Sequence, residues 1–317
     1  MIDDLKLPKS YFKSIEFTMQ VGCSVGCNFC PQGIFVKNYK SNIKSFTLET
    51  FKKALTNIKN STIEEVKFSG FSEPLENSDI YDCILEAYSQ GYRVELITTL
   101  KNLSETGFKK IKDLPIKCHV SIQPPNLNNR KGLSDATAWN NVEQLLSLKP
   151  KCELVFGCLD NGLTQQNKND LQNIENRLNI AIKYERYTTR AGYAGSVLKT
   201  NAHKKLVCKH NLGQVALPNG DLALCCMDFG LKHIVGNIFS EHYNDILNGE
   251  KLKSIVQIML GQKEGEILCQ TCEYAKAIPG FLSPKCYVNA RESFKNLRDK
   301  LVPKNSSTRK KLDALFR

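Results

Sequence analysis

An alternation of short apolar segments with longer segments of helical periodicity constrains the fold of this 317-residue chain most strongly. The predicted strands are residues 14–20, 64–69, 93–99, 116–123, 152–159 and 180–188. The predicted helices between them are residues 47–59, 78–90, 104–113, 135–148 and 165–178. Because parallel strands need crossover helices, the alternation predicts an α/β fold with a parallel sheet, either doubly wound or an open barrel.

Two conspicuous motifs follow the first two predicted strands. VGCSVGCNFCPQG comes after the first strand and contains Cys23, Cys27 and Cys30, and SGFSEPLE comes after the second. Parallel α/β folds bind their ligands at the carboxyl ends of the strands. We therefore expect both motifs to lie in the functional site.

The CxxxCxxC spacing brings three thiolates into one short loop. A four-iron cluster is usually held by four cysteines, so three ligands leave one iron open to an amine and a carboxylate of a small molecule. Gly22 and Gly26 allow the loop to wrap closely around such a cluster. The alternatives are a zinc site or unrelated buried thiols. Zinc would need a fourth ligand, and no histidine lies nearby in the sequence.

This loop resembles that of the radical S-adenosylmethionine (radical SAM) family, and the resemblance covers about residues 14–190. It implies a partial (β/α)6 TIM-like barrel, with a 4Fe-4S cluster on the three cysteines. The GFSEP segment is similar to the family's GGEP element, which receives the SAM amino group, although Phe71 and Ser72 stand where glycines are common. The residues that the resemblance assigns to SAM are Phe29, Gly70, Phe71, Ser72, Glu73, Ser121 and Gln123.

The resemblance also implies a chemistry. Such enzymes cleave SAM reductively, and the resulting 5′-deoxyadenosyl radical abstracts a hydrogen atom from an unactivated carbon. The expected electron donor is a flavodoxin or a ferredoxin. Thr98 and Thr99, at the end of the third predicted strand, are weaker candidates for SAM contacts.

A second set of cysteines follows the predicted barrel, within residues 191–287. It resembles the twitch or SPASM extension of some radical SAM enzymes, because a Gly-x4-Cys hairpin ending at Cys225 precedes a CxxC pair. The implied auxiliary 4Fe-4S ligands are Cys208, Cys225, Cys269 and Cys272. Cys226 could replace its neighbour, since spacing does not separate the two. A structural zinc ribbon is the alternative.

Two residues are candidates for the reaction itself. Arg190 follows the sixth predicted strand, where a guanidinium could bind a carboxylate or phosphate of the substrate through two hydrogen bonds. Cys118 lies in the fourth strand, where core packing is the ordinary role of a cysteine. If its thiol faces the barrel lumen, it could donate a hydrogen atom.

We expect a cytoplasmic protein. The first residues, MIDDLKLPKS, lack the apolar stretch of a signal peptide, and no segment approaches the roughly 18 apolar residues of a membrane span. The chain nevertheless has 13 cysteines, which in a reducing compartment indicate metal or redox chemistry rather than disulfides.

The net charge of +12 indicates an anionic partner. Half of it lies in residues 288–317, where nine lysines and arginines accompany three acidic residues. The plainest interpretation of this tail is a solvated terminal helix. Its charge also suits weak contact with a membrane surface or a lipid-linked glycan. Nucleic acid is disfavoured because no RNA-binding motif accompanies the charge.

Three classes of function compete. The favoured one is a radical SAM dehydrogenase or epimerase of a sugar, aminocyclitol or glycan precursor, because CPQG, FSGFSEPL and TTRAG are similar to radical SAM proteins of polysaccharide gene clusters. The alternative is epimerisation or crosslinking of a ribosomally made peptide. Such enzymes often carry an N-terminal recognition domain, whereas only residues 1–13 precede the first strand here. A non-catalytic metal-binding protein is the third class.

Overall fold

The computed structural model describes residues 7, 9–195, 205–208, 212, 214–279 and isolated positions between 286 and 299. The six strands of the predicted repeat are β1 (Ser14–Phe17), β2 (Glu65–Phe68), β3 (Arg93–Thr98), β4 (Lys117–Ile122), β5 (Glu153–Asp160) and β6 (Ile182–Arg186). The helices between them are α1 (Gln32–Asn38), α2 (Leu48–Ile58), α3 (Ile80–Ser89), α4 (Glu105–Ile111), α5 (Asp135–Ser147) and α6 (Gln165–Leu178). The basic tail predicted at 288–317 lies almost wholly outside the described residues.

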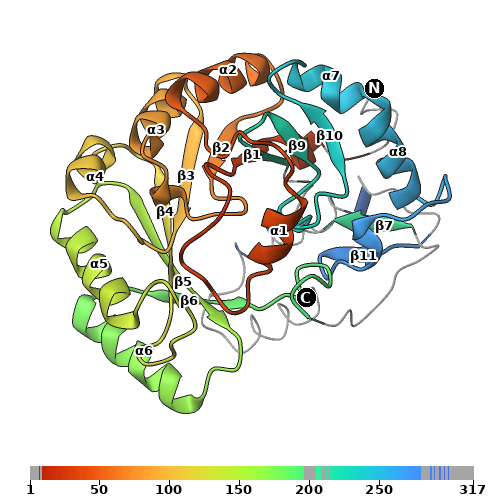
Figure 1. Ribbon diagram of the computed structural model, residues 1–317. Helices are drawn as coiled ribbons and strands as arrows, with labels where there is room; N and C mark the ends of the chain where they lie inside the picture. The colour runs from red at the N-terminus through yellow and green to blue at the C-terminus, as the bar shows by residue number, and fades with distance from the viewer. Residues whose placement is uncertain are drawn as a thin grey trace.

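The six strands form a parallel sheet in sequence order, β1 to β6. Helices α2 to α6 follow one another along the outer side of this sheet (Figure 1). A doubly wound sheet would carry helices on both faces, so the arrangement is the partial barrel. The predicted α/β class and open barrel are confirmed.

Packing of aromatic side chains joins the strands to their covering helices. The Phe17 ring meets Phe51 of α2 edge to face at a centroid distance of 4.9 Å, and Phe68 packs against Phe51 at 5.4 Å. Thr47 begins α2 with a capping box, in which its hydroxyl accepts a hydrogen bond from the Thr50 amide. The amphipathic helix is thereby fixed with its apolar face on the sheet.

The remaining described elements follow the barrel. They are β7 (Leu206–Cys208), β8 (Gln214–Ala216), β9 (Asp221–Ala223), β10 (Ile234–Asn237), α7 (Tyr243–Asn248), α8 (Glu250–Met259) and β11 (Ala275–Ala277). β8 pairs in parallel with β1, so β8, β9 and β10 extend the barrel sheet to nine strands. β7 pairs with β11 in a second, two-stranded sheet.

Two details differ from the sequence prediction. The helical periodicity of residues 242–260 predicts one helix, but the structure has two, α7 and α8, because the extended backbone of Gly249 ends one helix and begins the next. The hairpin expected after the barrel is formed by β8 and β9, and its strand β8 pairs with β1 of the barrel sheet, a contact that the sequence did not predict. No helix among the described residues is long and apolar enough to span a membrane.

The inner face of the barrel is charged. Along β4, Cys118, Val120 and Ile122 are buried on the helix side, while the intervening residues are less buried. At the amino end of the lumen, Glu95 is only 3% exposed, and its two oxygens receive hydrogen bonds from Lys117 Nζ at 2.5 Å and Lys67 Nζ at 2.8 Å. Burial alone would raise the pKa of Glu95, but the two lysines outweigh it and lower that pKa.

Replacing Glu95 with glutamine is expected to lower the free energy of unfolding by about 3 kcal/mol, because it leaves two lysines in the lumen without their shared anion. Since the folded pKa of Glu95 is lowered, its contribution is complete above the unfolded value of 4.5 and is lost as the pH falls through the folded pKa. Chemical denaturation at pH 7 and at pH 4 would measure both effects. Exposed Glu153→Gln is the control and should change stability by less than about 0.5 kcal/mol; equal effects of the two variants would contradict the prediction.

Candidate active site

The cysteine loop after β1 is held in place by the loop that follows β4. The Asn28 amide donates to the Asn129 carbonyl at 3.0 Å, and the Gly132 amide donates to the Val25 carbonyl at 2.9 Å. Cys27 and Arg130 form an isolated antiparallel bridge. From the other side, the Glu76 carboxylate accepts from the Ser24 amide, and Lys101 Nζ donates to the Ser24 carbonyl at 2.7 Å. The backbone between Cys23, Cys27 and Cys30 is therefore fixed from several directions.

Gly132 is the closest point of this contact. A Cβ atom built on it would lie 1.7 Å from the Ser24 carbonyl oxygen, so Gly132→Ala must push the two loops apart. We expect this variant to lose most of the iron held by the N-terminal cysteines, since overpacking of this kind costs about 1–3 kcal/mol. Gly33→Ala is the matched control, because nothing lies within 4 Å of its Cβ position. Iron analysis of both reconstituted proteins checks the prediction, which fails if they hold equal iron.

The segment after β2 meets β1 closely. Gly70 has φ of +67°, and a Cβ on it would overlap Thr18 Oγ1, so only glycine fits. The Phe71 amide donates to the same Oγ1 at 3.0 Å, while the Phe71 ring packs between Phe35 and Phe229, each at a centroid distance of 4.8 Å. Any contact of Phe71 with SAM must therefore come from its backbone.

Glu73 is buried, and its carboxylate accepts hydrogen bonds from Thr98 and Thr99. The Thr99 amide and Oγ1 both lie 2.7 Å from Glu73 Oε2. Burial raises the pKa of Glu73 in spite of these donors. The two threonines, which the sequence suggested as weaker SAM contacts, orient this carboxylate. The neighbouring Ser72 Oγ is buried without a hydrogen-bond partner.

Arg130, which the sequence analysis missed, lies at the same edge of the sheet. It is only 4% exposed; its Nη2 donates to Ser121 Oγ at 2.9 Å, while Nε and Nη1 have no partner. It also lies beside Cys27, whose pKa burial raises and the guanidinium partly lowers. Gln123 Nε2 is likewise buried and unpaired. A buried guanidinium with unpaired N–H groups is suited to binding an anion such as a carboxylate.

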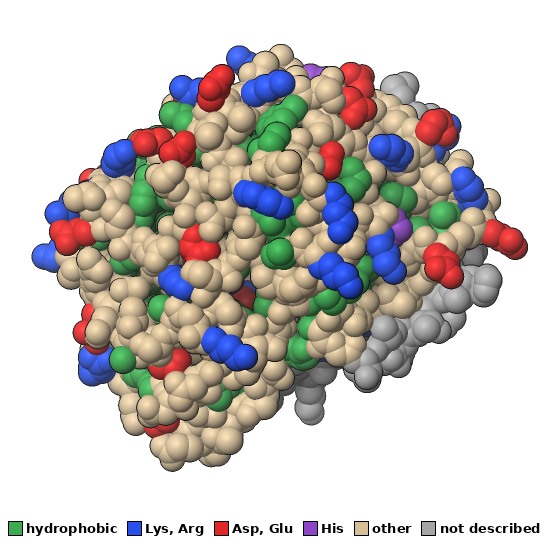
Figure 2. Space-filling view, viewed as in Figure 1, with side chains coloured by type: hydrophobic (Ala, Val, Ile, Leu, Met, Phe, Trp, Pro, Cys, Tyr) green, Lys and Arg blue, Asp and Glu red, His purple; other side chains and the backbone are tan. Residues whose placement is uncertain are grey.

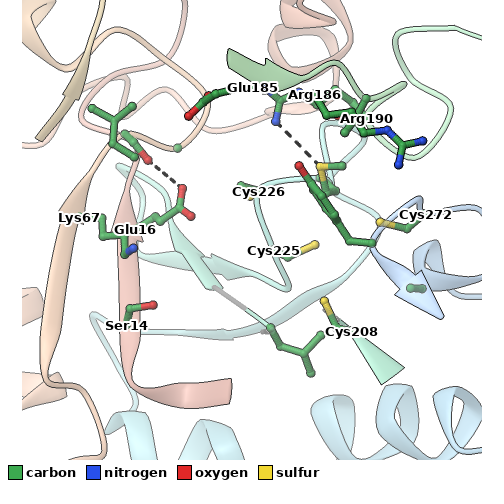
Figure 3. Close-up of a pocket in the computed structure, with 18 of the residues that line it drawn as sticks. Ser14, Glu16, Lys67, Glu185, Arg186, Arg190, Cys208, Cys225, Cys226 and Cys272 are labelled. Atoms are coloured by element: carbon green, nitrogen blue, oxygen red, sulfur yellow. Dashed lines mark hydrogen bonds between the residues drawn. The ribbon is translucent and has the colours of Figure 1, made fainter. Parts of the chain in front are cut away.

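The second set of cysteines lines a cavity of about 810 Å³ (Figure 3). Its wall contains the predicted auxiliary ligands Cys208, Cys225, Cys269 and Cys272, together with Cys226. Among the described residues, no three His, Cys, Asp or Glu side chains are grouped as they would be around a single metal ion. A four-iron cluster differs in binding each cysteine at a separate iron.

The same cavity extends into the barrel, where Phe29 and Gly70 line it. Arg190 lines it too, and its Nη1 lies 3.9 Å from Met227 Sδ. Arg190 and Ala191 both have left-handed backbone conformations, with φ of 51° and 55°. The Glu273 carboxylate accepts hydrogen bonds from the amides on either side of Arg190, those of Thr189 and Ala191, and so holds this strained turn.

The prediction for Cys118 is wrong. Its side chain is completely buried in the core on the helix side of β4, near Cys152, and does not reach the cavity. Adjacent residues of a strand point to opposite faces, so His119 occupies the lumen side, where its Nε2 lies 3.3 Å from Glu185 Oε1.

The comparisons with known sequences agree with this architecture. The SPASM model, described as an iron–sulfur cluster-binding domain, matches residues 208–273. A probable dual-specificity RNA methyltransferase RlmN from Synechocystis sp. is 26% identical over 153 residues, which is 46% of this chain and 43% of that protein. This chain thus matches less than half the length of that curated relative.

Solved structures share the fold. SuiB of Streptococcus suis, solved with the precursor peptide SuiA, is similar with a TM-score of 0.64 and 12% identity over 92% of this chain and 75% of that chain. BtrN, solved with AdoMet and 2-DOIA, gives a TM-score of 0.54 and 16% identity over 84% of this chain and 94% of that chain.

A partial barrel with a three-cysteine loop after its first strand, followed by a SPASM-type segment, defines the class of radical SAM proteins. The chain is similar to radical SAM enzymes with a C-terminal twitch/SPASM-like domain, and this likeness supports SAM and 4Fe-4S clusters as its cofactors. The residues present fit these groups. The unpaired N–H groups of Arg130 suit the SAM carboxylate, and four cysteines of the second set line one cavity.

Proposed function

We propose that this enzyme abstracts a hydrogen atom from a sugar, an aminocyclitol or a glycan precursor, and acts as a dehydrogenase or an epimerase. One observation carries the proposal: a single cavity reaches from Phe29 and Gly70, beside the cysteine loop, to the auxiliary cysteines. Its volume of about 810 Å³ lies in the range of small-molecule sites.

The lining of the cavity suits a polar substrate. Its charged and hydroxyl-bearing side chains include Ser14, Glu16, Lys67, Ser69, Glu185, Arg186, Thr188 and Arg190. Glu16 Oε2 accepts a hydrogen bond from Ser69 Oγ at 2.8 Å, and the carboxylate also interacts with the Gly70 backbone and with Lys67, so it is held in place at the cavity wall, where it can accept from a substrate hydroxyl or amine. Arg186 and Arg190 are suited to a carboxylate or phosphate.

On the face of the molecule shown in Figure 2, acidic and basic side chains are interspersed, with a group of lysines and arginines near its middle.

The chain's own residues position the reactants. When bound, the reduced cluster and SAM supply a carbon-centred radical that can abstract hydrogen. We assign Arg130 and Ser121 to the SAM carboxylate, since the guanidinium is buried, unpaired on two nitrogens and adjacent to Cys27. We assign Glu73 and the backbone of Gly70 and Phe71 to the surroundings of the SAM amino group. We propose a ferredoxin or flavodoxin as electron donor, in the cytoplasm.

A second candidate is modification of a ribosomally made peptide. It is favoured by the likeness to SuiB, which was solved with a precursor peptide. The two candidates differ in what must enter the cavity: a sugar-sized molecule can be enclosed by it, whereas a peptide must leave its flanking residues outside.

The proposal is tested with the anaerobically reconstituted enzyme, SAM and dithionite, by measuring 5′-deoxyadenosine. The probes are aminocyclitols, nucleotide sugars and short synthetic peptides. We expect at least one aminocyclitol or nucleotide sugar to raise 5′-deoxyadenosine formation by about tenfold, as binding of a true substrate promotes the chemical step. When the stimulating sugar is supplied in deuterated form, its deuterium should appear in the 5′-deoxyadenosine. Stimulation by peptides alone would overturn the sugar assignment.

A further inference from the structure

Five cysteines line the cavity, but a 4Fe-4S cluster takes four. The extra thiol belongs to the Cys225–Cys226 pair, which directly follows Leu224 at the end of the β8–β9 hairpin. The structure separates these two neighbours. Cys225 packs against an apolar cluster that also contacts Cys272, whereas Cys226 packs against another that also contacts Cys30 of the N-terminal cysteine loop.

The charged surroundings of the two thiols differ in the same way. Cys225 interacts electrostatically with Cys269 and Cys208, both predicted auxiliary ligands. For Cys226 the leading charged neighbours are instead Glu16 of β1 and Arg190, which line the barrel side of the cavity, and the auxiliary cysteines Cys208 and Cys272 come after them. Figure 3 shows Cys225 pointing toward Cys208 and Cys272, while Cys226 lies on the side nearer Glu16.

We propose that Cys226 is a free thiol of the reaction cavity rather than a cluster ligand, and that it donates a hydrogen atom to the substrate radical. This inference rests on the proposed function and selects one branch of it, an epimerisation. The thiol lines the same cavity as Glu16 and Arg190, and it packs against the apolar cluster that also contacts Cys30.

The step balances as follows. The S–H bond of Cys226 breaks, and a C–H bond forms on the face of the substrate opposite to the one that lost its hydrogen. The resulting thiyl radical takes up one electron from a ferredoxin- or flavodoxin-class donor and one proton from solvent, which restores the thiol. Substrate and product then have the same oxidation state.

Iron analysis tests whether Cys226 is free. We expect about eight irons per chain in the wild type and in Cys226→Ala, and about four in Cys225→Ala, the matched neighbour. Loss of about four irons in Cys226→Ala would overturn the proposal.

Deuterium labelling tests the donation. In D2O with dithionite, SAM and the sugar panel, the wild type should return one deuterium per converted sugar. Cys226→Ala should form 5′-deoxyadenosine but no deuterated sugar, and an unchanged deuterium content in this variant would refute hydrogen donation. If no sugar reacts with the wild type, the sugar assignment fails separately. In that case, the deuterium content of the 5′-deoxyadenosine formed without substrate is compared between the wild type and Cys226→Ala. A lower content in the variant supports the proposal, and equal contents refute it.

Discussion

Replacing Cys23, Cys27 and Cys30 together with alanine is expected to abolish reductive cleavage of SAM and to remove about four of the eight irons that we expect per chain. The effect is complete because the loop supplies every protein ligand that the sequence predicts for the SAM-binding cluster. Without these thiolates neither the cluster nor an open iron for SAM can form. Iron and sulfide analysis, with chromatography of 5′-deoxyadenosine, measures both losses.

Cys152→Ala is the control for this triple variant, because Cys152 is a buried core thiol immediately before β5 and lines no part of the cavity. It should retain full iron and SAM cleavage. Retention of all iron by the triple variant would contradict the cluster assignment. About four irons in the wild type and none in the triple variant, with zinc present, would instead make the C-terminal cysteines a zinc site.

Replacing Arg130 with methionine is expected to raise the Kd for SAM by about 10–100-fold, the range of charge-assisted hydrogen bonds worth about 1.5–3 kcal/mol. The guanidinium is buried, and two of its nitrogens have no partner in the protein. Methionine keeps much of the side-chain volume but removes the charge and every donor. Anaerobic calorimetric titration of the reconstituted enzyme with SAM measures the change.

Arg177→Met provides the matched comparison. Arg177 lies on α6, half exposed, with its Nη1 2.7 Å from Glu143 Oε1, so its loss should leave SAM affinity unchanged. Iron content must be measured for both variants, since Arg130 also borders Cys27. An unchanged Kd in Arg130→Met with full iron would remove Arg130 from the SAM site.

The sequence alone predicted the barrel and the cysteine loop after its first strand. It also contained a pattern of charged residues that the prediction did not use. Strands buried on both faces are nearly all apolar. Here Glu16, Lys67, Glu95 and Lys117 alternate with apolar neighbours in four successive strands. Such alternation requires one polar face, which favours an open barrel with a polar lumen over a doubly wound sheet. The same periodicity, applied to Cys118, would have placed its thiol on the apolar helix side.

Other features depend on pairings between distant segments, which local patterns do not determine. The parallel pairing of β8 with β1 joins residues about 200 positions apart. Arg130 has no distinctive local context in NLNNRKG, and its importance appears only once the loop after β4 pairs with the cysteine loop. Similarly, Cys225 and Cys226 are equivalent by spacing and differ only in what surrounds them in three dimensions.

The hydrogen bonds from the turn around Arg190 to Glu273 affect how genetic experiments on this enzyme should be interpreted. Glu273 directly follows Cys272, so a substitution that disturbs the CxxC segment also releases the strained turn that carries Arg190. A Cys272 variant would therefore show a raised KM that mimics an arginine variant, although its primary defect is in a predicted cluster ligand. A double variant of Cys272 and Arg190 would separate the two causes. If both substitutions raise KM by displacing Arg190, their effects on KM do not add.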